Sequence, residues 1–144
     1  MATGSWMRKE TPWSLIQQYV QLTNEELKHI FINSSLIFRV KTCNDANFRL
    51  GRSGPDTVVI GGKRNTKMWI NGCEINHAHG ILSCTEFRSF WFTFKNSTIS
   101  VGRGEKVGER GLMNCSIRGN KAFGMYITTF IKNPGTWLFR KRTG

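Results

Sequence analysis

Long apolar runs and acidic residues are scarce in this sequence. No stretch of its 144 residues approaches the roughly 20 consecutive apolar residues of a membrane-spanning helix. The first thirty residues contain no apolar segment typical of a secretory signal peptide. We therefore expect no membrane span. The sequence is compatible with either an extracellular or a cytoplasmic location.

Motifs of nucleophilic and acid-base catalysis are also missing. There is no Gly-x-Ser-x-Gly elbow and no plausible catalytic triad. Paired carboxylates are hard to find because only nine residues are Asp or Glu. We expect a protein that is not an enzyme and that needs no cofactor.

The shortage of acids leaves a strongly basic chain. Its 21 Lys and Arg residues give a formal net charge of +12. Residues 1–27 hold two basic and three acidic side chains, so the positive excess lies in residues 28–144. Such an excess favours an anionic partner, which can be a nucleic acid, an acidic polysaccharide or an anionic membrane surface. The alternative is a basic but merely solvated surface.

The apolar residues recur with a period of two, which predicts β-strands. Phe90, Phe92 and Phe94 alternate with polar or aromatic residues, and turn residues such as Asn71-Gly72 separate the apolar runs. We expect an all-β, antiparallel β-sandwich of at least seven strands in two packed sheets. The segments with this pattern are 36–41, 47–50, 57–60, 68–70, 86–94, 98–101, 112–117, 122–130 and 137–140.

One short segment has a helical signature. Thr23-Asn-Glu-Glu26 matches a capping box and precedes Leu27 and Ile30 at helical spacing. The apolar pattern stops after about two turns, so we expect at most a short helical turn here.

The cysteines are even in number, which is compatible with two disulfides or with four buried thiols. They are Cys43, Cys73, Cys84 and Cys115. Two of them flank His77 and His79, and such a set can bind zinc in principle. The spacing is not that of an established zinc motif, so we expect no metal.

Several stretches in order resemble the farnesoic acid O-methyltransferase-like domain. They are Phe38–Leu50, Val59–Lys67, Gly80–Phe92, Ile99–Gly104, Tyr126–Thr129 and Pro134–Trp137. The resemblance covers roughly residues 36–139. We expect a single domain over residues 1–144, with an N-terminal arm of strand and loop (1–35), this core (36–139) and a basic tail (140–144).

The resemblance marks eight positions as structural. In that group we expect the two glycines at 61 and 62 to allow positive φ or a bulge, and the acid at 45 to cap its own turn. Of the aromatic residues at 90, 91 and 92, the middle one faces the opposite way and is expected to be the most exposed. The positions are Asp45, Gly61, Gly62, Asn65, Trp91, Gly102, Gly135 and Trp137.

The family name implies methyl transfer from S-adenosylmethionine to farnesoic acid. Methyltransferases usually bind that cofactor at a glycine-rich turn between a strand and a helix. The closest match here, Val101–Gly108, has its glycines off the expected spacing, and no helical pattern follows it. Methyl transfer is therefore kept as an alternative function.

Cationic side chains are the main candidates for ligand binding. The family's Trp after Gly-Gly is here Lys63, followed by Arg64. Arg39, Lys41 and Arg49 are expected on one solvent face of neighbouring strands. The full candidate set is Lys63, Arg64, Lys67, Trp69, Arg103, Arg140, Lys141 and Arg142.

We interpret the chain as a binding module for an anionic ligand such as an acidic glycan, or for a protein partner. Nucleic acid is an alternative partner, supported only by the aromatic Trp69 beside Lys67. The identity of the ligand and the oligomeric state do not follow from the sequence.

Overall fold

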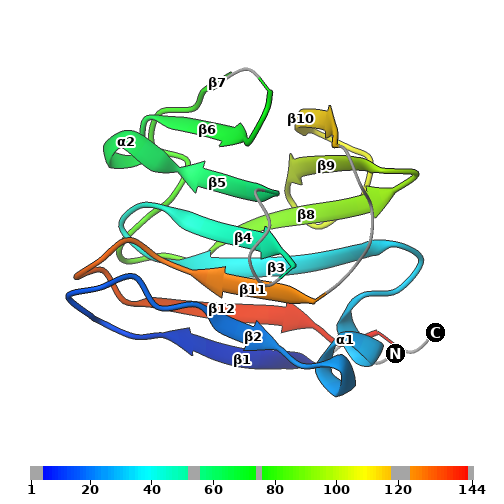
Figure 1. Ribbon diagram of the computed structural model, residues 1–144, viewed down its shortest axis with the longest axis horizontal. Coiled ribbons are helices and arrows are strands. Elements are labelled where there is room, and N and C mark those ends of the chain that lie inside the picture. Colours follow the sequence, from blue (N-terminus) through cyan, green and yellow to red (C-terminus); the bar gives the residue numbers. More distant parts are fainter. Residues whose placement is uncertain (1–4, 52–55, 74–75, 118–123, 143–144) are drawn as a thin grey trace.

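Two antiparallel six-stranded sheets pack face to face in a computed structural model of the chain (Figure 1). The structure describes residues 5–51, 56–73, 76–117 and 124–142. The expected all-β sandwich is confirmed. Among the described residues, neither helix is long or apolar enough to cross a membrane.

The first sheet, called sheet A, contains both ends of the chain. Its N-terminal edge strand pairs with the last strand, so residues of the expected arm are part of the sheet. In spatial order its strands are β1 (Trp6–Thr11), β12 (Gly135–Arg140), β3 (Ser35–Lys41), β8 (Arg88–Lys95), β9 (Thr98–Arg103) and β10 (Gly111–Ser116).

The second sheet, sheet B, lies in front of sheet A in Figure 1. The predicted strand at 122–130 is observed as a shorter strand, because residues 129 and 130 lie outside it and residues 122 and 123 are outside the described residues. In spatial order the strands are β2 (Val20–Leu22), β11 (Met125–Thr128), β4 (Ala46–Leu50), β5 (Thr57–Gly61), β6 (Lys67–Ile70) and β7 (Asn76–His77).

Aromatic side chains fill the core between the sheets. Phe38, Phe90 and Trp137 project from sheet A, and Phe48 projects from sheet B between them. All four are at most 1% exposed. The alternation in the sequence therefore indicated the buried faces correctly.

Helix α1 (Asn24–Ile30) has the expected capping box. The Glu26 N–H donates to Thr23 Oγ1 at 3.1 Å, and the Thr23 N–H donates to Glu26 Oε1 at 2.8 Å. The helix makes about two turns, longer than the single turn we expected. Its last residue, Ile30, is buried, and Lys9 of β1 forms an ion pair with Glu26, so tertiary contacts extend it.

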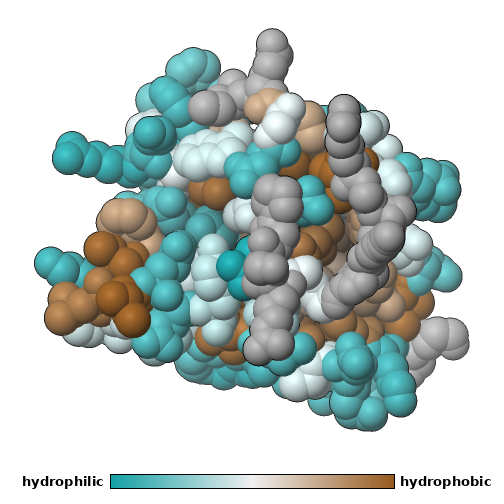
Figure 2. Space-filling model, viewed as in Figure 1, coloured by the Kyte–Doolittle hydropathy of each residue, from teal (hydrophilic) through white to brown (hydrophobic). Residues whose placement is uncertain are grey.

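The connections that follow β1, β3, β5, β7 and β11 lie at one end of the sandwich, on the left in Figure 1. The β9–β10 connection starts at the same end of sheet A, because β9 runs antiparallel to β8. We call this end the loop end. The opposite end holds the two termini, α1 and the β8–β9 turn. In the space-filling view, a group of exposed apolar side chains marks the left edge, within a mostly polar surface (Figure 2). The candidate site lies at the loop end.

Candidate ligand-binding surface at the loop end

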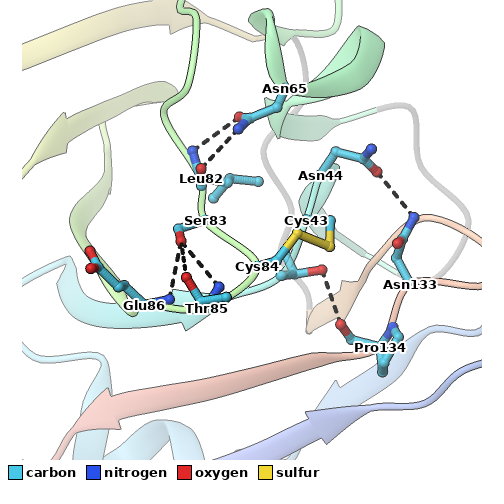
Figure 3. The surroundings of a disulfide bond; sticks show 11 residues. Cys43, Asn44, Asn65, Leu82, Ser83, Cys84, Thr85, Glu86, Asn133 and Pro134 are labelled. Carbon is cyan, nitrogen blue, oxygen red and sulfur yellow. Dashed lines mark hydrogen bonds between the residues drawn. A yellow bond between two sulfur atoms is a disulfide. The ribbon is translucent and has the colours of Figure 1, made fainter.

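A disulfide ties the connections of the loop end together (Figure 3). Cys43, in the β3–β4 turn, is bonded to Cys84, in the β7–β8 connection. Beside it, Asn133 Nδ2 donates to Asn44 Oδ1 at 3.3 Å, which adds the β11–β12 connection. These cross-links hold segments that are far apart in the sequence in one arrangement.

The second disulfide joins the two sheets. Cys73 follows β6 of sheet B, and Cys115 belongs to β10 of sheet A. Of the two alternatives that the cysteine count left open, the structure has the two disulfides. The zinc alternative is wrong, because Cys73 and Cys84 are both bonded to other cysteines.

The β5–β6 connection is a left-handed turn, which we call the basic loop (residues 61–67). Its short helical element α2 (Gly62–Asn65) contains Lys63, Arg64 and Asn65 at φ of 51°, 61° and 64°. Consecutive residues with side chains rarely adopt this conformation, since each costs roughly 1–2 kcal/mol. It persists only where the surroundings determine it.

The surroundings of the basic loop supply that constraint. The Asn65 amide makes two hydrogen bonds to the backbone of Leu82, at 2.8 and 3.0 Å (Figure 3). A Cβ at Gly61, which has φ of 72°, would lie 2.4 Å from Leu82, and one at Gly62 would lie 2.5 Å from the Trp69 ring. The Gly-Gly-x-x-Asn pattern is therefore explained by packing, and the expected positive φ is confirmed at Gly61.

The basic loop presents its cations to solvent. Lys63 and Arg64 are exposed, whereas Lys67 and Trp69 are half-buried on the outer face of sheet B. Trp69 packs against Gly62, so one face of its ring is already covered. A role of these residues in binding remains a prediction.

Asp45 lies beside the basic loop. Its backbone N–H donates to the Gly61 carbonyl at 2.9 Å, and no side-chain hydrogen bond to another described residue is found, so the expected capping bond is not observed. Burial raises the pKa of Asp45 to about 6, while the charge of Lys63 acts in the opposite direction. The carboxylate is thus an unfavourable charge at neutral pH.

Replacing Asp45 by Asn is expected to stabilise the protein by about 1 kcal/mol at pH 7.5, with allowance for solvent screening. Because the folded-state pKa is raised from 3.8 to about 6, the stability linked to this group is present below pH 3.8 and is lost as the pH rises through about 6. Asn tolerates the φ of 55° at this position. Urea unfolding at pH 7.5 and at pH 4 measures the difference, which should be much smaller at pH 4. A less stable variant at pH 7.5 would contradict the assignment.

A second cationic feature lies at the start of β8 and the end of β9. Arg88, Arg103 and Arg110 line a hollow of ≈310 Å³, with Ile81 and Phe90 at its apolar wall. A neighbouring hollow of ≈380 Å³ adds Lys106 to the lining. We call the two together the arginine hollow.

Two carboxylates line the arginine hollow, Glu105 and the exposed Glu109, and Glu105 is already neutralised. It accepts hydrogen bonds from Arg39 Nε at 2.7 Å, from Ser89 Oγ at 2.7 Å and from Arg140 Nη2. The hydrogen bond from Arg39 is the main cause that holds the pKa of Glu105 below its ordinary value, against the effect of burial. A carboxyl group in this environment stays ionised and does not serve as a general acid at neutral pH.

The predicted cationic face of Arg39, Lys41 and Arg49 is wrong. The strands β3 and β4 are neighbours in sequence but belong to different sheets, so Arg49 lies on the opposite side of the sandwich. Arg39 is paired with Glu105, and the guanidinium of Arg49 stacks on Tyr19 at 3.9 Å. The alternation of apolar residues does not indicate whether two consecutive strands belong to the same sheet.

Two of the basic residues near the C-terminus are bound by protein atoms. Arg140 pairs with Glu105, and Arg142 donates hydrogen bonds to the carbonyls of Ile30 and Ile32. Lys141 is exposed but follows β12 at the opposite end of the sandwich. Their proposed ligand contacts are untested, and these residues are not near the basic loop.

Trp91 is the most exposed of the three aromatic residues at 90, 91 and 92, as expected, but it is still buried. Its side chain is on the outer face of sheet A as predicted, but it is only 4% exposed. The β9–β10 connection folds over it, and Trp91 Nε1 donates to the Glu109 carbonyl at 2.7 Å. Gly102 lies directly beneath the ring, where a Cβ would come within 2.2 Å.

Three residues of the arginine hollow were not predicted from the sequence: Arg88, Lys106 and Arg110. The first begins β8 and the last directly precedes β10, so their separation in sequence is large. In the sequence, these three residues have only one feature in common, which is a position near the end of a predicted strand. The antiparallel pairing of β8 with β9, and of β9 with β10, brings them together.

Comparison with known families supports the resemblance seen in the motifs. A family model described as farnesoic acid O-methyl transferase matches residues 13–142. The chain belongs to this family. A search of curated proteins finds no match.

Solved structures similar to this family member share its fold. A prokaryotic β-1,3-1,4-glucanase (lichenase) derived from a mouse hindgut metagenome has a TM-score of 0.53 at 12% identity, over 76% of this chain and 66% of that one. A Bacillus licheniformis β-glucanase has a TM-score of 0.50 at 10% identity, over 99% and 94%. At such identities the likeness concerns the sandwich alone.

In this member of the farnesoic acid O-methyltransferase family, the glycine-rich stretch lies between two antiparallel strands and not between a strand and a helix. Gly104 and Gly108 lie in the connection between β9 and β10, which pair antiparallel. No helix follows, and both sheets pair antiparallel throughout the described residues. The segment shapes the wall of the arginine hollow instead.

Proposed function

We propose that this domain binds acidic polysaccharides through a cationic surface made of the basic loop and the arginine hollow. The observation that carries the proposal is a group of cations without ion-pair partners among the described residues. Cations that are gathered around a hollow and not neutralised by the protein attract an extended anion. The group consists of Lys63, Arg64, Arg103, Lys106 and Arg110.

The basic loop and the arginine hollow border the same short segment. Asn65 of the basic loop binds the backbone of Leu82, and the preceding residue, Ile81, lines the hollow. The disulfide at Cys84 anchors this segment. A surface held in this way loses little conformational entropy when a ligand binds.

Arginine side chains favour carboxylate and sulfate groups, to which the guanidinium donates two parallel hydrogen bonds. A flexible acidic glycan can bridge the hollow and the basic loop, whereas a neutral glycan gains nothing from either. The solved neighbours act on β-glucans, as their names state. Glycosidases of the usual kind need two free carboxyl groups, and of the two carboxylates that line the hollow, Glu105 and Glu109, the first is held between two arginines. Binding without cleavage is the function that fits this geometry.

We expect the double variant Lys63→Ala/Arg64→Ala to elute from an immobilised sulfated or uronic-acid polysaccharide at lower salt than the wild type. The variant Arg103→Ala/Arg110→Ala should also elute at lower salt. In each double variant, the slope of the logarithm of the binding constant for the polysaccharide against the logarithm of the salt concentration should fall in magnitude by about two. The matched control removes two exposed cations at the opposite end, Lys95→Ala/Lys141→Ala, and should leave elution almost unchanged. Equal elution of all three variants would mean a solvated surface only.

Methyl transfer is the alternative that the family description favours. Titration calorimetry with S-adenosylmethionine distinguishes the two functions, and we expect no heat of binding at physiological concentration. Micromolar affinity together with a methylated farnesoate product would replace the proposal. Single-stranded DNA of the same charge tests the nucleic-acid alternative on the same column.

A further inference from the structure

Exposed apolar side chains gather on two connections of the loop end. Trp13, Leu15 and Ile16 of the β1–β2 connection are 57%, 65% and 68% exposed, and Phe130 of the β11–β12 connection is 46% exposed. They are four of the six large apolar side chains that are exposed in the described part of the chain. We call these four residues the apolar tip.

The two connections form one projection. The Lys132 N–H donates to the Ser14 carbonyl at 2.8 Å, and Asn133 binds Asn44 in the β3–β4 turn. In Figure 2 the apolar group protrudes at the left edge, where these connections lie in Figure 1. A protruding apolar group on a polar surface marks a contact with another apolar phase or molecule.

The charges around the apolar tip are positive. Lys132 is exposed on the same connection as Phe130, and Lys63 and Arg64 lie at the same end of the sandwich. Of the acids of this end, Glu10 and Glu86 each form an ion pair with an arginine two residues away, and the charge of Asp45 faces that of Lys63. An anionic bilayer offers an apolar interior beneath a negative surface, and this complements the tip in both respects.

We propose that the apolar tip inserts into the interface of an anionic lipid bilayer, with Lys132 at the headgroups. The aromatic rings of Trp13 and Phe130 suit the boundary between headgroups and acyl chains. Leu15 and Ile16 supply the aliphatic surface that leaves water. The insertion uses residues outside the cationic surface for polysaccharide, so either activity can fail alone.

The test is co-sedimentation of the protein with vesicles of phosphatidylcholine, with and without about 30% phosphatidylserine, at about 150 mM salt. We expect binding to the anionic vesicles and a blue shift of the tryptophan emission, to which Trp13 contributes as one of five tryptophans. The variant Leu15→Ser/Ile16→Ser should bind at least about tenfold more weakly, and Lys132→Glu should lose part of the binding. Neither change should alter elution from the polysaccharide column.

The control variant is Val107→Ser, which removes another exposed aliphatic side chain, on the β9–β10 connection. It should bind vesicles like the wild type. Equal binding of Leu15→Ser/Ile16→Ser and wild type, or no binding of the wild type to anionic vesicles, overturns the proposal. A wild-type dimer in sedimentation velocity that this double variant dissociates would also overturn it, and would assign the tip to a contact between copies.

Discussion

Replacing Cys43 and Cys84 together by serine is expected to lower the free energy of unfolding by about 4 kcal/mol. The disulfide closes a loop with a sequence separation of 41 residues, so it restricts the unfolded chain considerably. In the folded state it fixes the segment that carries Ile81 and Leu82, which lies between the basic loop and the arginine hollow. We therefore expect weaker polysaccharide binding as well, because the cationic surface becomes less ordered.

The second disulfide is the matched control for this prediction. Cys73 and Cys115 close a loop of nearly the same length, with a separation of 42 residues, but they lie away from the loop end. Serine at both positions should cost a similar free energy of unfolding and leave polysaccharide elution unchanged. Urea unfolding and column elution of both variants provide the measurements. Equal loss of binding in the two variants would show that stability alone, and not the position of the Cys43–Cys84 bond, controls the surface.

Replacing Trp137 by Ala is expected to destabilise the protein by about 3–5 kcal/mol. The ring is fully buried and contacts the rings of Phe38 and Phe139, with centroids 5.7 and 6.0 Å away. Removing it leaves a cavity between the two sheets that rigid strands cannot close. Equilibrium unfolding in urea measures the loss, and a value under about 1 kcal/mol would contradict the packing described above.

A conservative change separates packing from hydrogen bonding at this position. Trp137 Nε1 donates to Thr11 Oγ1 at 3.2 Å, in a buried group that also includes Thr129. Phenylalanine keeps most of the apolar contact but removes the donor, so we expect a loss of about 1–2 kcal/mol. The Thr11→Val variant should lose a comparable amount, and the double variant should lose less than the sum.

Local patterns in the sequence were sufficient for the fold class and the family. Alternation within single strands, as in Phe90–Phe94, reports which face is buried, because each residue's direction depends only on the pleat. The capping box at Thr23 was likewise readable, since its two hydrogen bonds join residues three apart. The glycines at 61 and 62 were expected to allow an unusual backbone, and the structure shows the neighbouring rings and methyl groups that require them.

The candidate site was predictable only in part. Lys63 and Arg64 were identified, and their exposure is as expected, because a turn with adjacent cations cannot be buried without partners. Arg88 and Arg110 were not, since nothing near them in the sequence indicates that β8 and β10 lie on either side of β9. The apolar tip was missed for the same reason, as Phe130 and Leu15 belong to connections more than a hundred residues apart.

The sequence by itself determined the alternating strands, their turns, the membership of the family and the excess of positive charge. Only the tertiary structure decided which cations have no ion-pair partner. Arg39 and Arg140 both pair with Glu105, which belongs to the β9–β10 connection and is distant from them in sequence. The tertiary structure also decided that Arg49 and Arg39 lie on opposite faces, since the chain changes sheets between β3 and β4. Both results have the same physical reason. Strand pairing depends on contacts between residues that are distant in sequence and pack in one core, whereas charge and alternation are properties of neighbouring residues.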